Sequence, residues 1–462
     1  MKRSILFISQ NAWIAFVQLV YLIAMSRLFT PRDFGYFIVE FSLISLLSTI
    51  GSAGFAQIVF SKKSESDDFI PSSLKLALKS GLALVSLGCL LVYPWFLLWQ
   101  ADMFWFGMFG PLIVLLLSPI FNLAASLIRA NFSPLFAVFS QVGAFTVGYA
   151  TATYLCFLTQ SPVFLFAAQA ISQAIVVLVY LFTARGDWGN RGNTLATQHG
   201  FSKNNFVARA RQLAGISFVA NNLFRWMTSV HIGASSLGQL NRSEAFTAGT
   251  LGLFQSAFTS TIGSQGRKGK KLHAQDEKYV AQLVATYALA TLTGSLLLST
   301  VIDPILVLVI GAQWQLAASL SQFLIIGWAG YSVISVISFV YETKADWMNA
   351  LSLQLFSLFV ALFTSIFLWA TSDLLLAAAI FGYSNLILSV LVSKSLAKAV
   401  LPTLFGIKNL RQNFSLFGSL ACLGAVLIAD LFSTSISVFM LGLIILGLGF
   451  TAANFLRMTR KL

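Results

Sequence analysis

Long apolar runs, separated by short polar stretches, recur from one end of the chain to the other. Each run is about 20 residues long, and a helix of that length crosses a hydrocarbon layer of roughly 30 Å. Pro and Gly punctuate the intervening turns, as at Thr30-Pro31, Ser161-Pro162 and Asp303-Pro304. We therefore predict fourteen membrane-spanning helices, at approximately 5–28, 36–60, 76–98, 106–128, 134–158, 163–183, 212–232, 245–265, 279–302, 316–341, 348–370, 374–393, 414–431 and 435–456.

The composition agrees with this pattern. Hydrophobic residues make up 57% of the chain and charged residues only 10%, whereas about 25% charged residues is usual in a soluble domain. We therefore expect an all-α integral membrane protein. The first apolar run is too long for the core of a signal peptide and another span follows it, so we expect it to be retained.

The positive charges are distributed asymmetrically. If the N-terminus is cytoplasmic, all but four of the 29 Lys and Arg residues fall at inner helix ends or in inner loops; the exceptions are Arg27, Arg32, Arg225 and Arg242. Cytoplasmic loops of membrane proteins collect Lys and Arg. This predicts a multi-pass protein of the cell (inner) membrane with both termini in the cytoplasm, and twelve spans is the alternative if one pair is misread. It also accounts for the net charge of +14 without a nucleic-acid partner.

A short internal repeat suggests that the chain has two similar halves. Ser48–Gly54 reads STIGSAG and Ser260–Gly266 reads STIGSQG, an offset of 212 residues, and each copy ends the second span of a proposed half. Six spans per half would give both halves the same orientation, the parallel-repeat arrangement of several transporters. We therefore predict a six-helix bundle at 1–183, a cytoplasmic linker at 184–206, a second six-helix bundle at 207–400 and two additional helices in 401–462.

Two motifs are similar to those of a known family. Ser26–Gly35 reads SRLFTPRDFG and resembles the R-L-x-x-P-x-D-F-G turn after the first helix of polysaccharide flippases. Leu306–Trp314 reads LVLVIGAQW and resembles their L-x-x-x-x-G-x-x-W segment after the ninth helix. On these residues the chain resembles the O-antigen and oligosaccharide-lipid translocases of the multidrug/oligosaccharidyl-lipid/polysaccharide (MOP) superfamily. It departs from the family at Phe29-Thr30, where a second Gly is usual.

The resemblance implies two bundles around a central cavity, alternating access and no cofactor. It implies export of a polyprenyl-pyrophosphate-linked oligosaccharide, such as an O-antigen, capsule or exopolysaccharide repeat unit, from the cytoplasmic to the outer leaflet. The implied partners are that lipid-linked oligosaccharide and membrane lipids. A glycan polymerase complex is an additional candidate partner.

Arg225 is the main candidate for contact with such a substrate. It lies about 20 Å along the seventh predicted span, and Ser217, Asn221, Arg225 and Ser229 recur at every fourth position of that helix. A charged group facing lipid is costly, so this stripe is expected to face a cavity or the partner bundle. We therefore predict Arg225, Asn221 and Ser229, with Arg27, as substrate-binding residues. The alternative for Arg225 is a structural role, with the guanidinium bonded to backbone carbonyls or reaching outward.

A second group of charged residues lies near the outer helix ends. Glu40 lies about 8 Å inside the second predicted span, where it could pair with Arg27. We predict Glu40, Asp33 and Arg242 as ion-coupling or gate residues. A plain stabilising pair is the alternative for Glu40, and Asp33, Arg242 and Glu244 are expected in exposed turns.

Other kinds of chemistry lack support in the sequence. Cysteines and histidines have no metal-ligand spacing, so we expect no metal site. The basic loop Gly263–Lys271 lacks the pattern of a nucleotide-binding loop. Short outer loops and the lack of a clustered Arg/His/Asp set argue against a membrane glycan polymerase, so we expect a transporter with no catalytic residues. The remaining alternative is an ion-coupled multidrug exporter of the same superfamily, which would favour acidic residues for cationic drugs.

Overall fold

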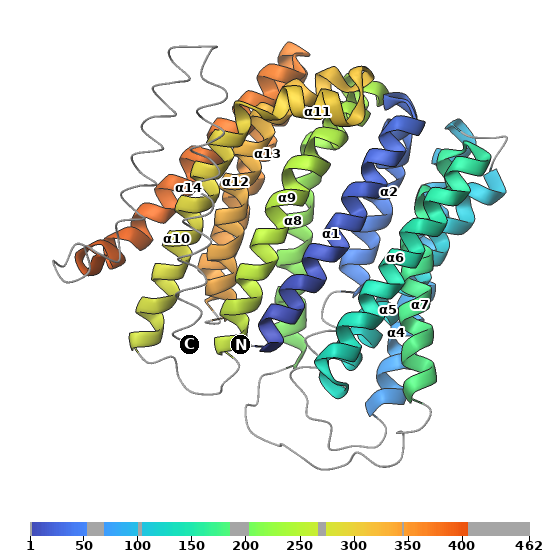
Figure 1. Cartoon of the computed structure of the whole chain (residues 1–462), viewed down its shortest axis with the longest axis horizontal. Helices are drawn as coiled ribbons and strands as arrows, with labels where there is room; N and C mark the ends of the chain where they lie inside the picture. The colour runs from blue at the N-terminus through green and yellow to red at the C-terminus, as the bar shows by residue number, and fades with distance from the viewer. Residues whose placement is uncertain are drawn as a thin grey trace. The chain divides into compact units, whose positions relative to one another are not determined.

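The structure, a computed structural model, describes residues 2–52, 69–99, 104–184, 203–266, 274–343 and 346–404. Over these ranges the chain is helical and contains no strand (Figure 1). It divides into two compact units. The N-terminal unit comprises Leu6–Asn222 with Gly233–Gly238, and the C-terminal unit comprises Met1–Ile5, Leu223–Ile232 and Gln239–Leu462. The predicted all-α membrane fold is confirmed over the described residues.

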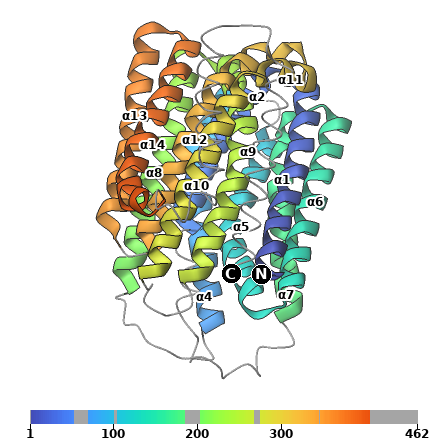
Figure 2. The ribbon, with the colours of Figure 1, turned by 60° about the vertical axis from the view of Figure 1, so that its left-hand side comes forward.

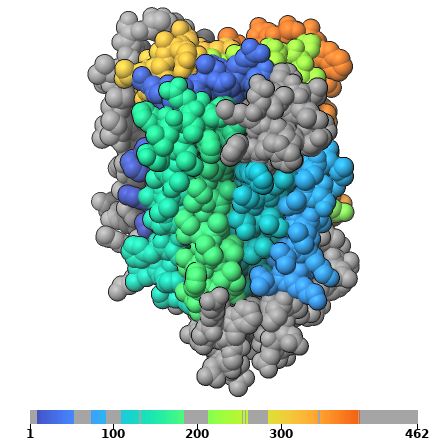
Figure 3. All heavy atoms as spheres, turned by 90° about the vertical axis from the view of Figure 1, so that its right-hand side faces the viewer, coloured from blue at the N-terminus to red at the C-terminus, as the bar shows by residue number. Residues whose placement is uncertain are grey.

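The N-terminal unit is a bundle of long helices. In chain order they are α1 (Lys2–Leu28), α2 (Pro31–Ser52), α4 (Phe69–Trp99), α5 (Phe104–Asn131), α6 (Pro134–Thr159), the short 3₁₀ helix η2 (Pro162–Phe166), α7 (Ala167–Ala184) and the first part of α8 (Lys203–His231). α5 packs against α2, α4 and α7, and α6 packs against α7. Figure 3 shows α6 and α7 (teal to green) beside α5 and α4 (cyan to blue).

Small and branched apolar residues fill the interior of this unit. Ala124 and Ile128 of α5 lie in one buried cluster with Ala137 of α6 and Val176 of α7. Alanines at such contacts let helix backbones approach closely, which is a main source of helix association where lipid removes the hydrophobic drive. The bundle is therefore held by close packing, with larger apolar side chains left on its outer faces.

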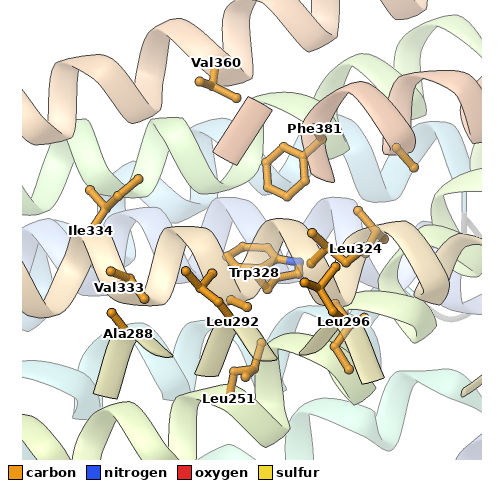
Figure 4. Close-up of a cluster of buried hydrophobic side chains, with 14 of the residues drawn as sticks. Leu251, Ala288, Leu292, Leu296, Leu324, Trp328, Val333, Ile334, Val360 and Phe381 are labelled. Carbon is orange, nitrogen blue, oxygen red and sulfur yellow. The ribbon is translucent and has the colours of Figure 1, made fainter. Parts of the chain in front are cut away.

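The C-terminal unit is built around one central helix. Its elements are the end of α8, α9 (Ala234–Gly266) from Gln239 onward, α10 (Ala274–Ser299), α11 (Ile302–Ile310), the 3₁₀ helix η3 (Ala312–Trp314), α12 (Gln315–Thr343), α13 (Trp347–Thr371) and α14 (Leu374–Leu404). α12 packs against α10, α11, α13 and α14. The long helices α10, α12, α13 and α14 run side by side (Figure 2). Trp328 of α12 lies among Leu292 of α10, Leu251 of α9 and Phe381 of α14 (Figure 4).

Eight helices of the described chain are long and apolar enough to cross a membrane, or nine if α10 and α11 form one broken span. α11 is bent by 68° from α10 at the break between Ser299 and Ile302, and it runs across the direction of its neighbours (Figure 1). Each of the first twelve predicted spans overlaps a helix over the described residues, although α9 begins at Ala234 and not near 245. The predicted spans 414–431 and 435–456 lie outside the described residues, so the total of fourteen stays a prediction.

Candidate functional site

Arg225 lies in the second half of α8, as the sequence indicated. Asn221, Arg225 and Ser229 share one side of the helix, and all three are partly exposed. The neighbouring Asn222 and Phe224 are buried, with 4% and 2% of their surfaces exposed. The polar stripe is therefore on a more accessible side of α8 than the residues that hold this helix in place.

The guanidinium of Arg225 forms an ion pair with a carboxylate from the next helix. Its Nε donates a hydrogen bond to Oε2 of Glu244 on α9. The Arg225 side chain is 20% exposed and that of Glu244 only 2%. The pair lies within the C-terminal unit, since both residues belong to it. The cation is thus the accessible member and the anion the enclosed one.

The burial of Glu244 corrects an expectation from the sequence. Glu244 and Arg242 were predicted in an exposed turn between the spans 212–232 and 245–265, but both side chains are buried. The reason is that α9 begins at Ala234, which places Glu244 about 15 Å inside the helix. Gly233 makes the actual turn with a φ of 114°, a conformation that glycine adopts readily. A glycine two residues after His231, the last residue of α8, is the sequence signal for this helix end.

Arg242 and Gln239 connect α9 to the segment that precedes α12. Gln239 Nε2 donates to the carbonyl oxygen of Gln313 at 2.8 Å, and its Oε1 accepts from the backbone N–H of Ala317 at 2.9 Å. The guanidinium carbon of Arg242 lies 5.8 Å from the ring centroid of Trp314, which is fully buried. The end of the L-x-x-x-x-G-x-x-W segment therefore packs against α9, in the turn of helix next to Glu244. Arg242 takes part in that packing, and its role as a gate residue stays a prediction.

Ser243 adds a further contact between α9 and α12. Its hydroxyl lies 2.8 Å from that of Ser321 on α12, and both are fully buried. Together with the two hydrogen bonds of Gln239, this contact fixes the stretch of α9 that carries Glu244. The residue before Glu244 is thus anchored to the central helix of the unit.

Glu40 is buried inside the N-terminal unit. It is 6% exposed, and its Oε1 has no hydrogen-bond partner among the residues that the structure describes. Arg27, at the end of α1, is exposed. The pairing with Arg27 that the sequence suggested is therefore not formed at this oxygen, and the ion-coupling role of Glu40 stays a prediction.

Asp33 has a clear structural contact at the start of α2. Its Oδ2 accepts hydrogen bonds from the backbone N–H of Thr30 at 3.0 Å and from the Thr30 hydroxyl at 2.7 Å. Thr30, Pro31 and Asp33 form the arrangement of a capping box, with Pro at the first helical position. An added Cβ on Gly35 would meet the carbonyl of Ala234, a residue of the same unit. Local geometry therefore accounts for much of the T-P-x-D-x-G pattern.

A polar seam between α1 and α6 was not singled out in the sequence. Gln10 donates to Oε1 of Gln141, and Arg129 Nη2 donates to the same oxygen at 2.8 Å. Further along, Trp13 Nε1 donates to the Thr146 hydroxyl at 3.1 Å. Polar residues spaced along the apolar run of α1 were the sequence signal that could have indicated these contacts with α6. Arg129, predicted at an inner helix end, lies in the last turn of α5 and is exposed.

No group of three or more His, Cys, Asp or Glu residues is placed to hold a metal ion within the described ranges. No protein-family model and no curated protein matches the sequence.

Solved structures share the fold. The chain is similar to the lipid II flippase MurJ in its inward closed conformation, with 15% identity, a TM-score of 0.66 and coverage of 98% of each chain. It is similar to a MOP superfamily transporter from Pyrococcus furiosus, with 13% identity, a TM-score of 0.62 and coverage of 86% of this chain and 95% of that one. An inward-facing multidrug resistance MATE family transporter gives 13% identity, a TM-score of 0.59 and coverage of 87% and 99%. The chain therefore has the fold of the transporters of the MOP superfamily.

Proposed function

We propose that this protein is a flippase that moves a polyprenyl-pyrophosphate-linked oligosaccharide from the cytoplasmic to the outer leaflet of the cell membrane by alternating access. Arg225 would contact the pyrophosphate, with Asn221 and Ser229 beside it and Arg27 as a further cation. The sugars would pass through a polar path while the polyprenyl chain stays in lipid. The proposal needs no cofactor and no catalytic residue.

The observation that carries the proposal is the partly exposed guanidinium of Arg225 on the polar stripe of α8. An ionised group far inside a membrane helix is costly, and such residues usually face a wet pathway. The planar guanidinium matches phosphate oxygens with paired N–H groups. An amide and a hydroxyl on the same side, from Asn221 and Ser229, supply further groups that bond to phosphate or sugar oxygens.

Coverage of the similar structures supports a lipid-linked substrate. The similarity to the lipid II flippase extends over 98% of both chains, whereas the MATE structures cover 86–87% of this chain. A polyprenyl pyrophosphate has a polar head and a long hydrocarbon chain, and the protein would have to accommodate both.

A multidrug exporter is the second candidate, and one observation favours it. Glu244 neutralises Arg225 locally, and Glu40 is a second buried acid, so the described interior is less cationic than the sequence suggested. A drug exporter predicts increased sensitivity to cationic drugs when the gene is deleted. A flippase predicts instead an accumulation of lipid-linked oligosaccharide that faces the cytoplasm.

Substitution of Arg225 tests the proposal. In a deletion strain, wild-type protein should restore surface glycan, Arg225→Ala should reduce it at least tenfold, and Arg225→Lys should give an intermediate level because one charge remains without the paired N–H groups. Arg32→Ala is the matched control, since Arg32 is exposed and hydrogen-bonded to Tyr36 at the start of α2. Normal surface glycan with Arg225→Ala, at wild-type protein levels, would show that the assignment is wrong.

A further inference from the structure

We propose that Glu244 is an internal anion that occupies the guanidinium of Arg225 until a phosphate group of the substrate replaces it. The inference rests on the proposed function and adds to it the residue that sets substrate affinity and allows release. Carboxylate and phosphate bind a guanidinium through the same charge-assisted hydrogen bonds. A carboxylate already seated there therefore competes directly with an incoming phosphate.

The exposure of the two side chains indicates which of them an incoming anion meets first. Arg225 is 20% exposed and Glu244 only 2%, so an anion arriving along the polar stripe of α8 meets the cation first. Because Arg225 has the longer side chain, it can turn toward the new anion while Glu244 keeps its position. The exchange is then a rotation of one side chain with no movement of α9.

The contacts that hold α9 in place support the assignment of Glu244 as the fixed partner and Arg225 as the mobile one. Gln239 is bonded to both Gln313 and Ala317, and Ser243 lies 2.8 Å from Ser321. These contacts lie just before Glu244 on α9 and tie that part of the helix to η3 and the first turns of α12. The carboxylate is thus presented from a rigid scaffold.

Charge balance adds a second consequence. When phosphate binds Arg225, a charged Glu244 would remain buried without its cation, which is strongly unfavourable. Uptake of one proton from solution converts the carboxylate to a neutral carboxylic acid and removes that cost. Substrate binding should therefore take up a proton, and substrate release should return it.

Three other ionisable side chains among the described residues of this unit have contacts of their own. Arg242, on the same helix, lies over the ring of Trp314. Asp303 of α11 accepts from Gln322 of α12 at 3.3 Å, and His231 at the end of α8 is hydrogen-bonded to Ser372. Glu244 is therefore the group expected to change protonation with the state of Arg225.

Binding of a polyprenyl pyrophosphate to the purified full chain in lipid nanodiscs tests the exchange. Wild-type affinity should rise from about pH 8 to about pH 6, by up to about tenfold per pH unit, because one linked proton gives that limit. Glu244→Gln should bind about tenfold more tightly than wild type at about pH 8 and lose most of the pH dependence. Glu342→Gln is the matched control; Glu342 is a carboxyl group of α12 that accepts a hydrogen bond from Ser338, and its variant should behave as wild type.

A measurement on the unaltered protein guards against misfolding of the variant. A pH-indicator dye in weakly buffered solution should report about one proton taken up per bound lipid. No uptake, or a Glu244→Gln variant with wild-type affinity and pH dependence, would overturn the exchange. If Arg225→Gln still weakens binding in that case, the proposed function stands. If wild-type protein binds no polyprenyl pyrophosphate at all, the proposed function and the exchange are both wrong.

Discussion

α2 and α9 each carry part of one copy of the short repeated sequence, yet their buried glutamates have different surroundings. Both helices end in the repeated sequence, Ser48–Ser52 in α2 and Ser260–Ser264 in α9. Glu244 of α9 has a cation partner in Arg225, whereas Oε1 of Glu40 in α2 has no hydrogen-bond partner. The repeat therefore preserves the end of the helix, while the charged group in its interior is specific to each unit. A buried charge with its partner suits exchange with a substrate, and a buried carboxyl group without one suits binding of a proton or cation.

The two helices also begin differently. The first turn of α2 is closed by Thr30 and Asp33 in a capping box, and α9 follows Gly233 with its φ of 114°. A side-chain cap satisfies backbone N–H groups and defines the first residue of a helix. A glycine turn leaves the start of the next helix to be set by packing, here by the contacts of Gln239 with Gln313 and Ala317. Both starts were predicted too late, near 36 for α2 and near 245 for α9, and the error was larger for α9.

The largest effect is expected for the paired glutamate. Glu244→Ala leaves Arg225 partly buried without its anion and should lower the free energy of unfolding by about 3–5 kcal/mol. Thermal unfolding in detergent measures the loss. The double variant Arg225→Ala/Glu244→Ala should recover part of it, because no unpaired charge remains. Equal stabilities for Glu244→Ala and wild type would mean that the ion pair contributes nothing, and the contrast with Glu40 would lose its energetic basis.

The hydrophobic pattern was sufficient to predict the all-α membrane fold, whereas the topology inferred from the charge asymmetry stays a prediction. Runs of about 20 apolar residues leave few alternatives to membrane helices, and the predicted position of Arg225 on a polar stripe agrees with α8. The short helix α11 was not predicted, because Asp303-Pro304, which lies in its first turn, was assigned to a turn between spans. A predicted span of 279–302 treated that punctuation as the end of the helix.

The partner of Arg225 was not predictable from helix patterns alone. Glu244 lies 19 positions away in the sequence, and the contact depends on where α9 begins. Placing that start near 245 put Glu244 in a turn and made it look exposed. The signal that was underused is Gly233, since moving the start of the helix to the next residue brings Arg242 and Glu244 inside it. The contact of Arg242 with Trp314 depends on tertiary packing and has no local signal.

A smaller effect is expected at the start of α2, where Asp33 was predicted as a gate residue. Thr30→Ala and Asp33→Ala each remove one side of the capping box and should each cost about 1 kcal/mol of stability. Thermal unfolding together with surface-glycan recovery separates the two roles. If Asp33 acts only as a cap, both variants lose similar stability and keep transport. Loss of transport in Asp33→Ala alone would assign it a gate role beyond its contact with Thr30.

The smallest effect on stability, and the most informative one for coupling, is expected at Glu40. Glu40→Gln keeps the shape and polarity of the side chain, so the free energy of unfolding should change by less than about 1 kcal/mol. If Glu40 couples transport to an ion gradient, flipping by this variant in proteoliposomes should no longer be accelerated by an imposed proton or sodium gradient. Its affinity for polyprenyl pyrophosphate, and the pH dependence of that affinity, should match wild type, because those properties are assigned to Glu244. Unchanged acceleration by both gradients would remove Glu40 from coupling and leave the Arg225–Glu244 pair as the site where a proton and the substrate are exchanged.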